Sequence, residues 1–150
     1  MIKFFNSCIE LEKTVSGIYT NLANIVDCDQ ELRKLWLNMA EEEYQHATQI
    51  ELASRLPKGT FIGIKITQET IDDLLDKALL VHKRTQSPGL SVTDSLRLSI
   101  KLETDFQAIH VASAAEFSSP SLSKLFLSLA KGDKVHTEAL EAFKKRLTHI

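Results

Sequence analysis

The sequence predicts an all-α protein, a bundle of four long helices joined as two hairpins. Three observations support this fold class. Apolar residues recur at spacings of three and four through four long segments, the pattern of an amphipathic helix. Only five glycines and three prolines occur among the 150 residues, so little interrupts these segments. Acidic residues and histidines also recur at matched places in the two halves of the chain.

The composition is that of one globular domain, which we expect to span residues 1–150. Hydrophobic residues make up 43% of the chain and charged residues 25%, enough for a sizeable core. The net charge of -2 gives no reason to expect nucleic acid or a membrane surface as partner. No apolar run is long enough for a signal peptide or for the ~20 residues of a membrane span. We therefore expect a cytoplasmic protein.

The first hairpin is predicted over residues 3–55. Its first helix should run from about residue 3 to residue 26, and its second from about residue 30 to residue 55. Asp27 and Asp29 in the turn supply carboxylates that can cap the second helix. So short a turn makes the two helices antiparallel neighbours. Cys8 and Cys28, near the two ends of the first helix, should be about 30 Å apart and remain reduced.

A long crossover, about residues 57–90, separates the two hairpins. Residues 57–59 should end the second helix, and residues 61–66 should be extended or loop-like. Thr67 or Thr70 should cap a shorter helix that ends near residue 83, before the break at residues 85–89. A crossover of this length allows the third long helix to lie parallel to the second.

The second hairpin is predicted over residues 93–147. Its first helix should run from residue 93 or 94 to about residue 117. Ser118, Ser119 and Pro120 form a helix start with proline at the first helical position, and the last helix should run over residues 121–147. Gly132 lies inside this last helix and lowers its local propensity by about 1 kcal/mol relative to alanine.

An acid and a histidine occur together on the second helix of each hairpin. Glu43 and His46 stand three residues apart, so they share one side of a helix, flanked by the apolar Met39 and Ile50. A carboxylate and an imidazole on an apolar stripe cost free energy unless they are satisfied, and a metal ion would satisfy them. The last helix repeats the pattern at the same spacings, with Leu129, Asp133, His136 and Leu140.

The first helix of each hairpin also carries one acid. Glu12 is followed seven residues later by Tyr19, and Glu103 is followed seven residues later by His110. Four carboxylates converging inside a bundle would repel each other and raise each other's pKa values, whereas two divalent cations would cancel their charge. Each imidazole would then complete one ion. An oxygen-rich set with one nitrogen per metal suits iron or manganese.

The chain resembles the rubrerythrin branch of the ferritin-like di-iron carboxylate family. The resemblance rests on Glu12 with Tyr19, residues 40–47 with their E-x-x-H motif, Glu103, and the pair Asp133 and His136. It covers most of the chain except the crossover. It implies a ferritin-like four-helix bundle with two iron ions, manganese or zinc being possible instead. The implied metal ligands are Glu12, Glu43, His46, Glu103, Asp133 and His136.

The resemblance also implies a role for each of these residues. Glu43 and Asp133 would bridge the two ions, Glu12 and Glu103 would each bind one ion terminally, and each histidine would bind one ion. The implied activity is that of an oxidoreductase of the peroxidase or ferroxidase type, acting on H₂O₂ or O₂. No catalytic residue is expected beyond the metal ligands, and an unidentified donor would return electrons. Additional apolar residues on the long helices are compatible with a homodimer.

The sequence departs from the rubrerythrin pattern in three ways. Asp133 stands where the family has glutamate, and a shorter side chain could change the metal spacing, weaken binding or leave one site empty. Phe106 occupies the position of an additional acid, which puts the ligand switching of the peroxidase reaction in question. We also expect no rubredoxin domain to deliver electrons. Two alternatives therefore stay open: a metal-binding bundle for storage, sensing or structure, and an interaction module that has lost its metal.

Several neighbouring polar residues have more modest expectations. Tyr19 and His110 could donate hydrogen bonds to ligand carboxylates across the bundle. Tyr19 could equally be a core tyrosine, and His110 could itself bind metal. Glu41 and Glu42 are expected to be solvated surface charges, and His82 and His149 are expected to be surface residues.

Overall fold

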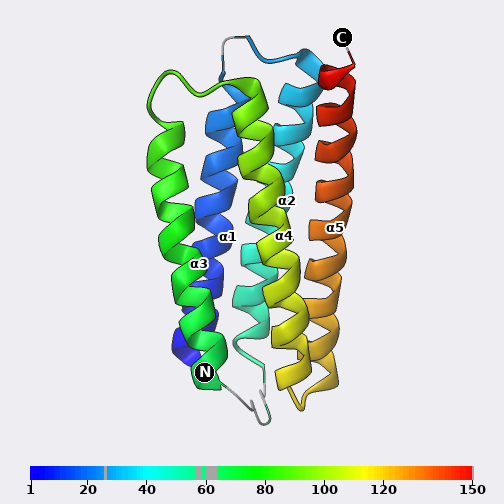
Figure 1. The fold of residues 1–150 in the computed structure, drawn as a ribbon. Coiled ribbons are helices and arrows are strands. Elements are labelled where there is room, and N and C mark those ends of the chain that lie inside the picture. The colour runs from blue at the N-terminus through cyan, green and yellow to red at the C-terminus, as the bar shows by residue number, and fades with distance from the viewer. Residues whose placement is uncertain (26, 57–58, 60–63, 150) are drawn as a thin grey trace.

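The computed structural model describes residues 1–25, 27–56, 59 and 64–149, and gives only the backbone of residues 64–66. Over this part of the chain it consists of five α-helices without a β-strand, arranged as a helical bundle (Figure 1). The predicted all-α class is therefore confirmed. None of the described helices combines the length and the apolar character needed to cross a lipid bilayer.

The first hairpin forms largely as predicted. Helix α1 (Ile2–Ala23) and helix α2 (Gln30–Ala53) run antiparallel and pack along each other (Figure 1). The carboxylate of Asp29 caps α2, accepting hydrogen bonds from the backbone N–H groups of Glu31 and Leu32 at 2.8 and 3.2 Å. Helix α1 ends at Ala23, and Val26, the predicted last residue of this helix, lies outside the described residues.

The crossover helix differs from the prediction. Helix α3 (Ile64–Thr85) has 22 residues, the same length as α1, so it is not short. It begins before Thr67, so residues 64–66 are helical rather than extended, while residues 57–58 and 60–63 lie outside the described part. The β-branched isoleucines of this stretch lower helix propensity only slightly. Packing of α3 along α1, through buried residues such as Ile71 and Ala78, outweighs that preference.

The second hairpin consists of α4 (Val92–Glu116) and α5 (Pro120–Thr148). Ser91 caps α4, accepting a hydrogen bond from the N–H of Asp94, and Ser119 caps α5, whose first residue is Pro120. The predicted serine-proline start of the last helix is therefore confirmed. Helix α4 runs in the same direction as α2, which the long crossover permits (Figure 1).

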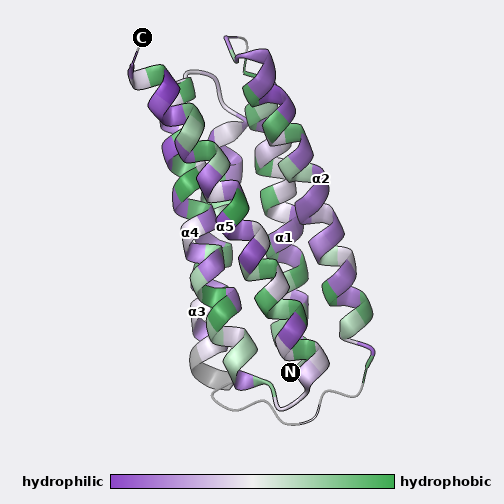
Figure 2. Cartoon of the chain, turned by 90° about the vertical axis from the view of Figure 1, so that its right-hand side faces the viewer, coloured by the Kyte–Doolittle hydropathy of each residue, from purple (hydrophilic) through white to green (hydrophobic). Residues whose placement is uncertain are grey.

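The core lies between these helices. Each helix turns its hydrophobic side inward and carries polar residues outside, so that purple and green alternate around every helix in Figure 2. Phe4, Phe5, Phe117 and Phe126 pack as an aromatic cluster near one end, with ring centroids 5.3–6.1 Å apart. Helix α3 lies outside the other four, against α1 and α4.

Candidate metal centre

The six predicted ligands come from four helices and lie inside the bundle. All four acids are fully buried, and His136 is 4% exposed, whereas the side chain of His46 is 13% exposed. Burying four carboxylates in a protein interior is unfavourable unless cations or hydrogen-bond donors compensate their charge. Helix α1 contributes Glu12, α2 contributes Glu43 and His46, α4 contributes Glu103, and α5 contributes Asp133 and His136.

Glu12, Glu43 and His46 form one compact group. Each offers a ligand atom, and these atoms all lie within 4.8 Å of one another. His46 Nδ1 is 3.1 Å from Glu43 Oε2 and 3.7 Å from Glu12 Oε2. The i, i+3 spacing on α2 therefore brings the acid and the imidazole together, as the sequence predicted.

Glu43, Glu103 and His136 form a second group of the same kind. His136 Nδ1 is 3.1 Å from Glu43 Oε1 and 3.2 Å from Glu103 Oε2. Glu43 thus belongs to both groups, with one carboxylate oxygen facing each histidine. This is the placement that a bridging carboxylate requires.

Asp133 is placed differently from Glu43. It belongs to neither group among the described residues, and its Oδ2 lies 2.7 Å from His110 Nδ1. Its other oxygen, Oδ1, is buried without a hydrogen-bond partner. The shorter aspartate therefore reaches His110, and its role as a second bridge stays a prediction.

Tyr19 and His110 each contact the acid of the opposite hairpin. The Tyr19 hydroxyl donates a hydrogen bond to Glu103 Oε1 across the bundle. His110 Nε2 lies 3.1 Å from Glu12 Oε1, so His110 links Glu12 to Asp133. Both residues thus have the positions of groups that orient ligand carboxylates.

Glu42 is a residue of the centre that the sequence did not reveal. Its Oε2 lies 2.5 Å from His136 Nε2, although it was expected to be a solvated surface charge. Its side chain is half-exposed, with 54% of its surface accessible. The residue next to Glu43 points about 100° away from it around the helix, so the spacing alone predicts exposure. Only the approach of α5 brings His136 within its reach.

The buried acids have strongly altered pKa values. Burial, together with the charge of Glu43, raises the pKa of Glu103 to about 8. Burial and the charge of Glu12 also raise the pKa of Glu43. Burial opposes the charge of Glu12 too, but its contacts with His110 and His46 outweigh that effect and lower its pKa to about 2. The histidine contacts thus favour the charged form of Glu12, whereas burial and neighbouring negative charges favour the protonated forms of Glu43 and Glu103.

Each of the three histidines has a raised pKa. Burial alone would lower their pKa values, but the surrounding carboxylates outweigh it. The pKa of His46 is raised to about 10 by Glu12 and Glu43, and that of His110 to about 10 by Asp133 and Glu12. Glu103 and Glu43 raise the pKa of His136 to about 11.

Buried oxygen atoms without a hydrogen-bond partner indicate whether these residues suit a metal. Among the described residues, five buried side-chain atoms lack a hydrogen-bond partner, and four of them belong to this centre. Three of the four lie near histidine nitrogens without forming a hydrogen bond of normal geometry. A cation would compensate such oxygens, so the residues fit a divalent metal. The four atoms are Oε1 and Oε2 of Glu12, Oε1 of Glu43 and Oδ1 of Asp133.

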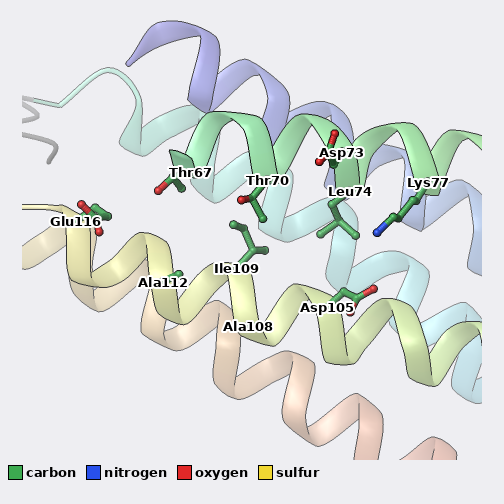
Figure 3. A pocket seen from close by; sticks show the side chains of 10 residues that line it. All are labelled: Thr67, Thr70, Asp73, Leu74, Lys77, Asp105, Ala108, Ile109, Ala112 and Glu116. Atoms are coloured by element: carbon green, nitrogen blue, oxygen red, sulfur yellow. The ribbon is translucent and has the colours of Figure 1, made fainter. Parts of the chain in front are cut away.

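An aromatic side chain lies beside His110. Phe106, where the resemblance would place an additional acid, is fully buried, and its ring centroid lies 6.1 Å from that of His110. A groove of about 470 Å³ runs between α3 and α4, lined by residues such as Thr70, Leu74 and Ile109 (Figure 3). None of the six predicted ligands lines it, so the groove and the centre are separate features.

Comparisons with protein-family models, with curated proteins and with solved structures found no match for this chain. The resemblance to rubrerythrins therefore stays a hypothesis, supported by the residues of the centre alone.

Proposed function

We propose that this chain is a ferritin-like carboxylate protein that binds two divalent metal ions, preferably iron, and uses them in redox chemistry with H₂O₂ or O₂. One observation carries the proposal: Glu43 faces His46 with one oxygen and His136 with the other. Two three-residue groups thus share one carboxylate, as two neighbouring cations would require.

The residues divide naturally between two ions. Glu12, Glu43 and His46 would hold one ion, and Glu43, Glu103 and His136 would hold the other. The unpartnered Oδ1 of Asp133 is a further oxygen donor. Such sets, rich in oxygen with one imidazole each, suit iron or manganese better than metals that prefer thiolates. When bound, iron would supply the electrons that reduce a small oxidant.

The protein's own residues would position the ligands and restrict access to them. The Tyr19 hydroxyl donates a hydrogen bond to Glu103, and His110 Nε2 lies 3.1 Å from Glu12 Oε1 as an ion-pair partner. Burial, followed by the charges of Glu103 and Glu43, raises the pKa of Tyr19 well above its usual value, so its hydroxyl keeps its proton and remains a donor. Because all four acids are fully buried, only small molecules could reach them without a rearrangement of the bundle.

Phe106 favours a second candidate function, metal binding without turnover. Peroxidase chemistry of the rubrerythrin type would use an additional acid at this position, by the resemblance noted above. The buried phenyl ring offers no such ligand. A bundle of this kind would store iron, sense a metal or use it for structure.

Metal analysis tests the binding proposal. Protein purified without chelators and loaded with Fe²⁺ under anaerobic conditions should contain two ions per chain. The double variant His46→Ala/His136→Ala should retain almost none, because each group loses its only nitrogen ligand. The matched control is His82→Ala/His149→Ala, which removes two histidines outside the centre and should keep both ions. Unchanged metal content in the first variant would refute the assignment.

Peroxide turnover separates the two candidate functions. H₂O₂ is added anaerobically to the Fe²⁺ form, with and without an excess of a small-molecule reductant, and its loss is followed over time. Peroxide consumption well beyond one equivalent per centre would support an oxidoreductase. Consumption that stops after a single oxidation of the bound iron, with every reductant tried, would favour storage or sensing.

A further inference from the structure

The outer nitrogen of each metal-binding histidine faces the residue that precedes the acid on the opposite second helix. On α2 this residue is Glu42, whose carboxylate lies 2.5 Å from His136 Nε2. On α5 it is Gly132, where an added Cβ would lie 3.5 Å from His46 Cε1 and 3.6 Å from His46 Nε2. The two hairpins are thus matched in position here, but one supplies a carboxylate and the other supplies no side chain.

This difference changes the state of the two imidazoles. An Nε2–H of His136 that is donated to Glu42 leaves Nδ1 facing Glu43 and Glu103 as the nitrogen that can bind a metal. Such a carboxylate partner fixes the ring orientation and increases the basicity of the ligand nitrogen. Among the described residues, His46 Nε2 makes no comparable hydrogen bond, and its side chain is more exposed than that of His136.

We infer that Glu42 is a positioning residue for His136 and makes the two halves of the centre unequal. The half formed by Glu43, Glu103 and His136 holds its cation more tightly. The half formed by Glu12, Glu43 and His46, beside Gly132, is the one that exchanges its cation with solution. The inference rests on the proposed function, because it presumes that both halves bind metal.

Anaerobic calorimetric titration of the metal-free full chain with Fe²⁺ tests the inequality. The wild type should bind two ions in two steps of different affinity. Glu42→Gln should weaken the tighter step by about 10- to 100-fold and leave the weaker step unchanged. The matched control is Glu41→Gln, which removes the same charge from a residue that pairs with Gln45 instead and should change neither step.

Adding the missing carboxylate provides the reverse test. Gly132→Glu places an acid beside His46 and should strengthen the weaker step, bringing the two affinities closer. Gly132→Ala is its control and should leave both steps unchanged. A Cβ at this position meets His46 at ordinary contact distance, so Gly132→Ala introduces no clash.

A spectroscopic measurement separates positioning from a general effect on folding. In ¹⁵N spectra of the Zn²⁺-loaded protein, the Nε2–H proton of His136 should exchange slowly with water in the wild type and in Glu41→Gln. In Glu42→Gln it should exchange faster, while the remaining signals and the thermal midpoint stay close to wild type. A general destabilisation would move all of these together and would count against a positioning role.

The titrations distinguish a failure of this inference from a failure of the proposed function. Two bound ions in the wild type, with unchanged or equally weakened steps in Glu42→Gln, would overturn the inference and leave the proposed function standing. A wild type that binds no Fe²⁺ would overturn the proposed function and this inference with it.

Discussion

The hairpin of α1 and α2 and the hairpin of α4 and α5 present the same pattern of acids and histidines but differ at several matched positions, three of which belong to the centre or adjoin it. Each difference changes which atoms the neighbouring side chains can reach. The matched pairs are Tyr19 and His110, Glu42 and Gly132, and Glu43 and Asp133.

Helix α2 contributes Glu43, the carboxylate that both three-residue groups share. Tyr19 has one polar atom and contacts one acid, whereas His110 has two ring nitrogens and contacts both Glu12 and Asp133. Asp133, one methylene shorter than glutamate, is thereby held away from the two three-residue groups. Among the described residues, only Glu43 faces both His46 and His136. The two hairpins therefore carry matched residues that make different contacts.

The largest expected effect follows from that inequality. Glu43→Gln should weaken both metal-binding steps, each by about 100-fold or more, since removing a shared ligand costs at least as much as removing a group that supports one. Asp133→Asn, its matched partner, should have a smaller effect on both. Calorimetric titration with Fe²⁺ measures both variants. Equal losses would show that Asp133 bridges the ions as the resemblance implied.

The residues that hold the acids should differ in their contribution to stability. His110→Phe leaves the buried Asp133 without its ion-pair partner and Glu12 with His46 alone, and we expect it to lower the free energy of unfolding by about 3–5 kcal/mol. Tyr19→Phe removes only one donor and should cost about 1–3 kcal/mol. Urea denaturation of the metal-free proteins gives both values. A larger loss of unfolding free energy in Tyr19→Phe than in His110→Phe would contradict this expectation.

Metal loading should stabilise the protein in proportion to the sites that remain. At a free metal concentration about 100 times Kd, one site contributes about 2.7 kcal/mol, which raises Tm by roughly 5–10 °C for a chain of this size. Glu43→Gln should show little of this rise. His46→Ala should keep more of it than His136→Ala, because it spares the tighter half. Thermal melts with and without a chelator decide this, and the opposite ranking would reverse the assignment of the two halves.

The smallest effect concerns Gly132. It is helical, and a methyl group there meets His46 without a clash, so Gly132→Ala should raise the free energy of unfolding of the metal-free protein by up to about 1 kcal/mol. Gly89→Ala is the contrasting control. Gly89 has φ +92°, which an alanine adopts only with strain, so that variant should lose about 1 kcal/mol. Destabilisation by Gly132→Ala would indicate that the space beside His46 is needed.

Much of the centre was predictable because helical spacing is regular. Glu43 and His46 share a helix face through their i, i+3 spacing, and the same rule places Asp133 and His136 together on α5. The start of α5 was predictable from Ser119 and Pro120, since capping is a local interaction. The beginning of α3 was not, because packing against α1 decided it rather than local propensity.

Backbone periodicity was enough to predict the helical segments and their inward faces, whereas the meeting of the acids and histidines was an expectation from the matched registers of the two hairpins. Tertiary structure alone decided that Glu42 reaches His136, that His110 takes up Asp133, and that Gly132 lies against His46. Contacts across a bundle depend on the rotation and offset of one helix relative to another. A shift of about one C–C bond length changes which side chains meet. No spacing along one helix contains that information.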